Sequence, residues 1–241
     1  MIKFFRKIRQ KLLTENKFSK YLLYAFGEII LVVIGILIAI QLNNINNAKT
    51  EKNQELTLLS EMAKNLELDL IDIEWNIERN TTLAQSNENV LKHLNEEVIE
   101  NDSLNFYYGN ILGNTAFVKN TSAYDNLKSI GLNLISNDSL RQQITRVYSE
   151  KYPYMHQIEI SYDQEIQLTH IYPQLISKIK NSTSTESAFP IDLGELKKDN
   201  QFKEILNQNI GVKKFIIYKQ NELRETINQL ISSINKEITK G

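Results

Sequence analysis

The chain has 241 residues with 28 basic and 29 acidic side chains, a formal net charge of -1 and no cysteine. The lack of cysteine excludes a disulfide framework, a zinc–thiolate site and a cysteine nucleophile. Beyond the apolar N-terminal part about 200 residues remain, which is enough for one soluble domain to bury a core without metal or disulfide staples.

Residues 1–20 are strongly basic and predict a cytoplasmic or interfacial segment. They carry seven Lys and Arg side chains against one acid, Glu15. Ile2, Phe5, Ile8 and Leu12 fall close to one helical face with basic residues around the rest, which is typical of an amphipathic helix lying in the headgroup layer. The alternative is that this segment only supplies the positive flank that orients the next one.

Residues 21–42 predict a transmembrane helix. The stretch LLYAFGEIILVVIGILIAIQL (22–42) contains one ionisable residue, Glu28, and at about 1.5 Å of rise per residue its length matches a hydrocarbon core of roughly 30 Å. The positive-inside rule places the N-terminus in the cytoplasm and the rest of the chain beyond the membrane, in a bacterium the periplasm. A cleaved signal peptide is the competing interpretation, but its apolar region is shorter, and no small-x-small cleavage box follows Ile40. We therefore expect an uncleaved signal anchor.

One face of this helix predicts contact with a second helix. A 3,4 spacing puts a set of residues on one stripe: Ala25, Glu28, Val32, Gly35 and Ala39. Gly35 and Ala39 form a small-xxx-small pair that lets another helix approach closely, and a carboxyl within a bilayer is a functional hypothesis by default. The alternative is that Glu28 reaches the cytoplasmic headgroups and has no role.

Residues 43–100 predict one long helix with a heptad pattern and without proline or glycine. Its apolar seam comprises Leu56, Leu59, Ala63, Leu66, Leu70, Ile73 and Ile77. Leu68, Ile71 and Trp75 add apolar surface outside the seam, which favours a bundle over a bare two-stranded coiled coil. Asn80 and Asn87 occupy later seam positions, where they either specify the register of an oligomer or simply face water as the bundle thins.

Residues 101–241 predict the helical remainder of the bundle. Capping clusters at 101–103 and 137–139 open helices, and Thr121-Ser122 and Gly131 bound a short one, so that one or two short helices are expected between residues 104 and 135. A helix over about 139–180 contains Pro153 and Pro173, each of which is expected to kink or break it. After a polar loop at 181–187, a short helix to Asn207 and a final helix over 212–238 complete the chain.

The residue pattern predicts no chemistry. His93, His156 and His170 are too scattered to share a metal and are expected at or near the surface. No GxSxG, P-loop, HExxH or dinucleotide glycine motif is present. Five tyrosines form a core or, in the alternative, line a ligand surface: Tyr148, Tyr152, Tyr154, Tyr162 and Tyr172. We expect no catalytic residue, no cofactor, no metal and no nucleic-acid partner.

Two stretches resemble a known family. KFFRKIRQKLLTENKFSKYLLYAFGEIILVVIGILIAIQLNNIN (3–46) looks like the opening block of an uncharacterised family of small Bacteroidota membrane proteins, and SAYDNLKSIGLNLISNDSLRQQITRVYS (122–149) is similar to a second stretch of that family. The family pattern usually has a tryptophan where this chain has Ile45, which weakens a special anchoring role for that site. The resemblance implies an inner-membrane address in a Gram-negative cell and an all-helical extracytoplasmic domain, and Glu28 matches a recurring position.

Together these observations predict an all-α, single-pass membrane protein with an antiparallel extracytoplasmic helical bundle. Its expected partners are the lipid bilayer and either further copies of the chain or other membrane proteins. The favoured function is structural, as a scaffold or assembly subunit of an envelope complex. The alternative is a ligand-sensing bundle that signals through a partner protein. A concave pocket lined by tyrosines would favour sensing, and a flat apolar face on the long helix would favour assembly.

Overall fold

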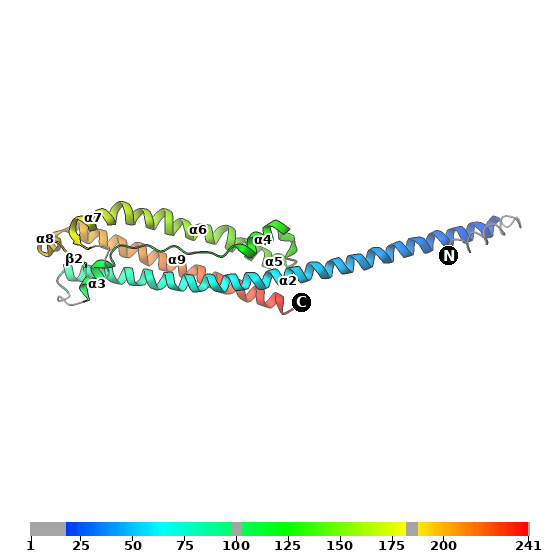
Figure 1. Cartoon of the computed structure of the whole chain (residues 1–241), viewed down its shortest axis with the longest axis horizontal. Helices are drawn as coiled ribbons and strands as arrows, with labels where there is room; N and C mark the ends of the chain where they lie inside the picture. Colours follow the sequence, from blue (N-terminus) through cyan, green and yellow to red (C-terminus); the bar gives the residue numbers. More distant parts are fainter. Residues whose placement is uncertain (1–17, 98–102, 182–187, 241) are drawn as a thin grey trace. The chain divides into compact units, whose positions relative to one another are not determined.

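The computed structural model describes residues 18–97, 103–181 and 188–240 (Figure 1). Most of the segment expected at residues 1–20, most of the capping cluster at 101–103 and most of the loop at 181–187 therefore lie outside the described residues. In chain order the elements are α2 (Phe18–Leu94), α3 (Leu104–Gly109), α4 (Ser122–Ile130), η1 (Leu132–Leu134), α5 (Asp138–Arg146), η2 (Val147–Lys151), α6 (Tyr152–His156), η3 (Gln157–Gln164), η4 (Gln167–Ile171), α7 (Tyr172–Lys178), β1 (Ile179–Lys180), β2 (Phe189–Pro190), α8 (Leu193–Lys198) and α9 (Asn200–Ile238). The chain is all-α apart from the two short strands.

Helix α2 contains both segments that the sequence predicts as separate helices. The chain divides into two compact units, Met1–Gln54 and Glu55–Gly241. In the first unit α2 carries a window of 18 residues with mean hydropathy 2.6 and no buried residue. Among the described residues it is the one helix long and apolar enough to cross a membrane. This is compatible with a single-pass membrane protein.

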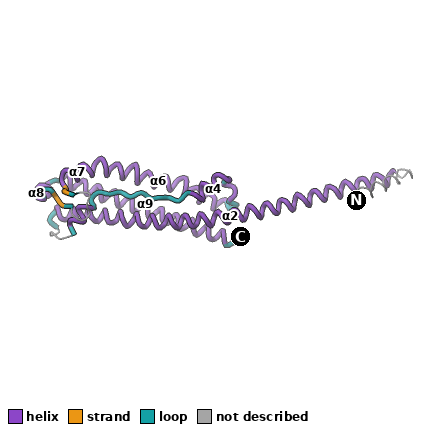
Figure 2. Tube along the Cα trace, viewed as in Figure 1, coloured by secondary structure: helices purple, strands orange, loops and turns teal. Residues whose placement is uncertain are grey.

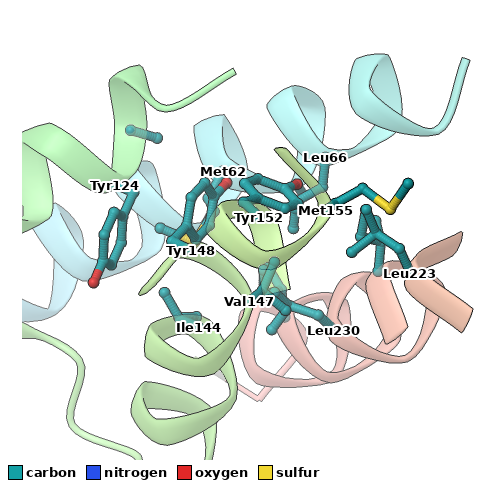
Figure 3. Close-up of a cluster of buried hydrophobic side chains, with 14 of the residues drawn as sticks. Met62, Leu66, Tyr124, Ile144, Val147, Tyr148, Tyr152, Met155, Leu223 and Leu230 are labelled. Carbon is teal, nitrogen blue, oxygen red and sulfur yellow. The ribbon is translucent and has the colours of Figure 1, made fainter. Parts of the chain in front are cut away.

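In the second unit three long helical stretches lie side by side (Figures 1 and 2). They are the later part of α2, the run of residues 138–178, and α9. Their apolar faces meet in a large cluster, whose labelled members in Figure 3 are Met62, Leu66, Tyr124, Ile144, Val147, Tyr148, Tyr152, Met155, Leu223 and Leu230. A second cluster at the other end includes Val90, Ile171 and Phe202. The two strands, which the sequence did not predict, pair antiparallel next to this second cluster.

The helical run 138–178 begins where the sequence predicts, and the side chain of Asn137 accepts a hydrogen bond from the backbone N–H of Leu140 at 3.2 Å. The sequence predicts a kink or a break at each proline, and the structure shows no break. A π-helical turn, η2 or η4, immediately precedes the α-helical segment that contains Pro153 or Pro173. A π turn inserts one residue into the hydrogen-bond register, so the run absorbs the missing proline donor and continues.

The final two predicted helices are one helix, α9. The carboxylate of Asp199 accepts a hydrogen bond from the backbone N–H of Phe202 at 2.9 Å and so caps its start. The gap predicted between residues 207 and 212 is therefore filled by helix. Within it Gly211 lies at an exposed position with open space around it. Thr121 and Gly131 bound α4 as predicted, with Gly131 at φ 122°.

Residues 113–120 form an extended segment without regular secondary structure, although the sequence predicts short helices and turns here. This extended segment runs along the helices from α3 to α4 as a teal tube in Figure 2. Gly113 takes φ 158°, close to fully extended backbone, and packs against Leu83 of α2. A segment without secondary structure must satisfy its backbone groups elsewhere, and side chains from the helices do so here.

Candidate functional site

The predicted membrane stripe lies on the first unit of α2. Ala25 and Glu28 are half-buried there, whereas Val32, Gly35 and Ala39 are exposed. A Cβ built on Gly35 has no neighbouring atom within 4 Å outside its own helix backbone. The part of this face around Gly35 is therefore open within one chain and leaves room for another helix, whose presence stays a prediction.

The predicted heptad seam is used inside the chain. Leu59, Ala63, Leu66 and Ile73 are buried in the large cluster, and Leu70 and Ile77 pack against it. Leu56 is half-buried. The seam covers the bundle's own core and so leaves little apolar surface on that side for a second chain.

A set of buried polar side chains separates the two apolar clusters. Helix α2, the 138–178 run and α9 each contribute members, and the extended segment contributes one. We call this set the polar layer: Asn76, Asn80, Asn87, Thr115, Glu159, Asp163, Gln167, Asn209, Lys213 and Gln220. Most of these side chains are fully buried, and buried polar groups are costly unless they are paired.

An ion pair lies at the centre of the polar layer. The ammonium group of Lys213 donates to both carboxylate oxygens of Asp163, at 2.6 and 2.8 Å, and both side chains are 0% exposed. Gln167 donates to Asp163 at 3.1 Å and to the carboxamide oxygen of Asn209 at 2.7 Å. Burial lowers the pKa of Lys213, and the adjacent Asp163 carboxylate opposes this shift. The pair joins the 138–178 run to α9.

The two seam asparagines belong to the same layer, so neither expectation for them holds. Asn80 is fully buried and donates to Thr115 at 2.9 Å and to Gln220 at 3.4 Å. Asn87 is fully buried and donates to the backbone carbonyl of Ile111 at 3.0 Å. They neither face water nor reach an oligomer seam, because their partners lie within their own chain.

Glu159 connects the polar layer to the extended segment. One carboxylate oxygen accepts from the backbone N–H of Phe117 at 2.8 Å and the other from the amide of Gln220 at 3.0 Å. Burial raises the pKa of Glu159 to about 7, against these two hydrogen bonds. Burial thus brings the pKa of this carboxyl close to neutral pH.

A second carboxylate, Asp69 of α2, holds the same segment further along. It accepts from the backbone and side chain of Asn120, at 2.8 and 2.7 Å, and from the hydroxyl of Tyr152 at 2.5 Å. Burial raises the pKa of Asp69, and the hydrogen bond from Tyr152 opposes that rise. Its neighbour Asp72 accepts from the backbone N–H of Val118 at 2.9 Å. Carboxylates thus replace the strand partner that the extended segment lacks.

The groups of the polar layer pair mainly with one another. Most donors and acceptors of the polar layer satisfy one another, and the exceptions are the carboxamide oxygens of Asn76 and Asn80, which accept no hydrogen bond from the described residues. Matched buried pairs fix which residues of neighbouring helices face each other, because any shift would strand a charge. Among the described residues no cluster of His, Asp or Glu has a metal-binding arrangement.

The tyrosines divide between the core and the surface. Tyr148 stacks on Tyr124 with ring centroids 4.5 Å apart, and Tyr152 lies fully buried beside Phe117. Tyr154, Tyr162 and Tyr172 are exposed. Of the histidines, His156 and His170 are exposed as expected, whereas His93 is buried and its ring nitrogen lies 3.0 Å from the hydroxyl of Tyr108.

Helix α2 also has an outer face that its own domain leaves uncovered. We use this name for Leu68, Ile71 and Trp75, which are 55%, 65% and 58% exposed. The sequence places these residues outside the seam but expects them to pack on further neighbours in a bundle. Within the described residues no such neighbour covers them.

The fold and these sites define an all-α protein with one long apolar helix compatible with a membrane span and a helical domain tied together by buried polar pairs. A model of a family of unknown function (DUF6090) matches residues 28–171. Because this match covers more than half of the chain, the protein belongs to that family. No curated protein and no solved structure matches the chain.

Proposed function

We propose that the protein is a non-enzymatic, single-pass protein of a Gram-negative inner membrane, a structural or assembly subunit of an envelope complex. In this proposal the N-terminus is cytoplasmic, the Glu55–Gly241 unit is a periplasmic helical bundle, and the chain associates with other copies through its membrane stripe. The bundle is not antiparallel throughout as the sequence predicts, because only α9 runs against α2 and the 138–178 run (Figure 1). The basic flank before the apolar helix supports this orientation. The resemblance of residues 3–46 to Bacteroidota membrane proteins supports the address.

The observation that carries the assembly role is the outer face of α2. The seam of this domain is already packed against its own core. Three adjacent large apolar side chains that stay exposed to water therefore add nothing to its stability. The buried polar layer supports the same role, because it makes the unit a rigid body that can present this face in one geometry.

The rival function, ligand sensing, has one observation in its favour. A groove of about 340 Å³ between α6 and α9 is lined by Tyr154, Lys151 and Lys219 among others. However, Tyr148 and Tyr152 are buried in the core and do not reach it. The flat apolar face on α2 therefore favours assembly over sensing.

Cysteine cross-linking in cells tests self-association directly, since the natural chain has no cysteine. Val32→Cys and Ala39→Cys lie on the stripe, and the matched controls Ile30→Cys and Leu37→Cys lie on the opposite side of a helix with 3.6 residues per turn. We expect oxidation to give a covalent dimer with the first two variants and not with the controls. Equal cross-linking at all four positions would contradict a defined stripe.

The orientation has its own test. Ser139 of α5 and Ser19 of α2 are both exposed, so Ser139→Cys and Ser19→Cys should leave the fold unchanged. A membrane-impermeant maleimide applied to intact cells should label the first variant and not the second. The reverse pattern would refute the proposed orientation.

A further inference from the structure

The outer face of α2 lies beside a row of acidic side chains. Glu67, Glu74 and Glu78 are exposed and follow the outer face at a spacing of seven and four residues. At 100° per residue they occupy the neighbouring strip of the same helix. Among the described residues none of the three takes part in an ion pair. We call these three residues the acidic row.

The other edge of the outer face meets the extended segment. Val118 is 70% exposed, and its backbone N–H is bonded to Asp72 of α2. The apolar side chains of α2 are therefore bordered by Val118 on one side and by the acidic row on the other. The three α2 side chains offer on the order of 300 Å² of apolar surface. A standard protein interface buries about 800 Å² on each partner, so this smaller area fits contact with a single helix.

Charge decides between a second copy and a different partner. A second copy could meet this face with its α2 helix parallel to the first. Lys64 and Glu78 lie at the two ends of the outer face, on the same helical strip. A parallel pair would set Lys64 against Lys64 and Glu78 against Glu78, and such like-charge contacts oppose association.

We propose that the outer face of α2 binds a basic amphipathic helix of another protein, whose apolar stripe packs on Leu68, Ile71 and Trp75 and whose Lys or Arg side chains pair with the acidic row. This deepens and rests on the proposed assembly function, because it names the class of partner that the subunit holds. Helix-in-groove and helix-on-helix recognition use the same i, i+3, i+7 anchors that this face presents.

The chain contains its own reporter of this contact. Trp75 is the single tryptophan of the sequence and is an exposed member of the outer face. We would place the full-length protein in zwitterionic lipid nanodiscs and titrate in a Leu/Lys amphipathic helical peptide that lacks tryptophan and tyrosine. The matched control peptide has glutamate in place of lysine. We expect a blue shift of the Trp75 emission with the basic peptide and none with the acidic one.

Variants then assign the contact. The triple change Glu67→Lys, Glu74→Lys and Glu78→Lys should weaken basic-peptide binding about tenfold at low salt, since three exposed ion pairs are lost. The control replaces three exposed glutamates of other helices, Glu165→Lys, Glu204→Lys and Glu225→Lys, and should leave the affinity unchanged. Ile71→Ser should also weaken binding, whereas Ile176→Ser, on α7 and 55% exposed against 65% for Ile71, should not.

Three results would overturn the proposal. They are no Trp75 shift with the basic peptide, an equal shift with both peptides, and a blue shift that follows protein concentration without any peptide. The last would assign the surface to a second copy. None of these results affects the cross-linking test at Val32 and Ala39, so failure of the peptide site and failure of self-association are distinguished.

Discussion

The buried pair of Lys213 and Asp163 makes the sharpest prediction about stability. In Lys213→Met the ammonium group is replaced by an apolar side chain of similar length. Asp163 then keeps only the amide of Gln167, at 3.1 Å, as a hydrogen-bond donor, and its carboxylate stays 0% exposed. Stranding a buried charge in this way costs about 3–5 kcal/mol. For a unit of this size the melting temperature should fall by roughly 6–20 °C.

The double variant Asp163→Val/Lys213→Met separates pairing from packing. Replacing both charges by apolar groups removes the desolvation cost together with the attraction, so its stability should lie within about 2 kcal/mol of the wild type. Urea unfolding followed by far-ultraviolet circular dichroism in mild detergent measures both. A loss below about 1 kcal/mol in the single variant would refute the reasoning, because it would mean that water reaches the pair.

Three further outcomes are expected from the same assay. Burial raises the pKa of Glu159 from 4.5 to about 7, so between these pH values the folded state keeps a proton that the unfolded state has lost. The free energy of unfolding should therefore fall by up to roughly 3 kcal/mol as pH rises through this window. Glu159→Gln should abolish this dependence of stability on pH. Tyr152→Phe removes a donor from the buried Asp69 and should cost about 1–2 kcal/mol; a neutral result would show that Asp69 is otherwise satisfied. Leu66→Ala in the core should lower the free energy of unfolding by about 2–5 kcal/mol, and Leu68→Ala on the outer face by under about 0.5 kcal/mol. Equal losses of stability would contradict the assignment of the two faces.

The long helix α2 and its seam could be predicted because their signal is local. Apolar residues at heptad spacing, such as Leu59, Leu66 and Ile73, point to one side of a helix wherever it packs. The cap at Asn137 and the stop at Gly131 are local as well. These features do not depend on what lies elsewhere in the chain.

The polar layer and the extended segment could not be predicted, since their partners are remote in sequence. Asn209 bonds to Asn87, 122 residues away, and Glu159 holds the backbone of Phe117, 42 residues away. Asn, Gln and Glu at these positions resemble a solvated helix face when only their neighbours are considered. The sequence predicts two helices here, one to Asn207 and one from 212, whereas α9 is continuous and turns its polar side toward the layer.

The mass of the full-length protein in mild detergent tests most directly whether the chain is an assembly subunit that associates through its membrane helix. Wild type should form a defined oligomer that dissociates in Glu28→Ala and in Gly35→Leu. Gly27→Leu is the matched control, because Gly27 lies about 120° from the centre of the stripe and has equally open space around it. A monomeric wild type, or an oligomer that survives both stripe substitutions, would contradict this account.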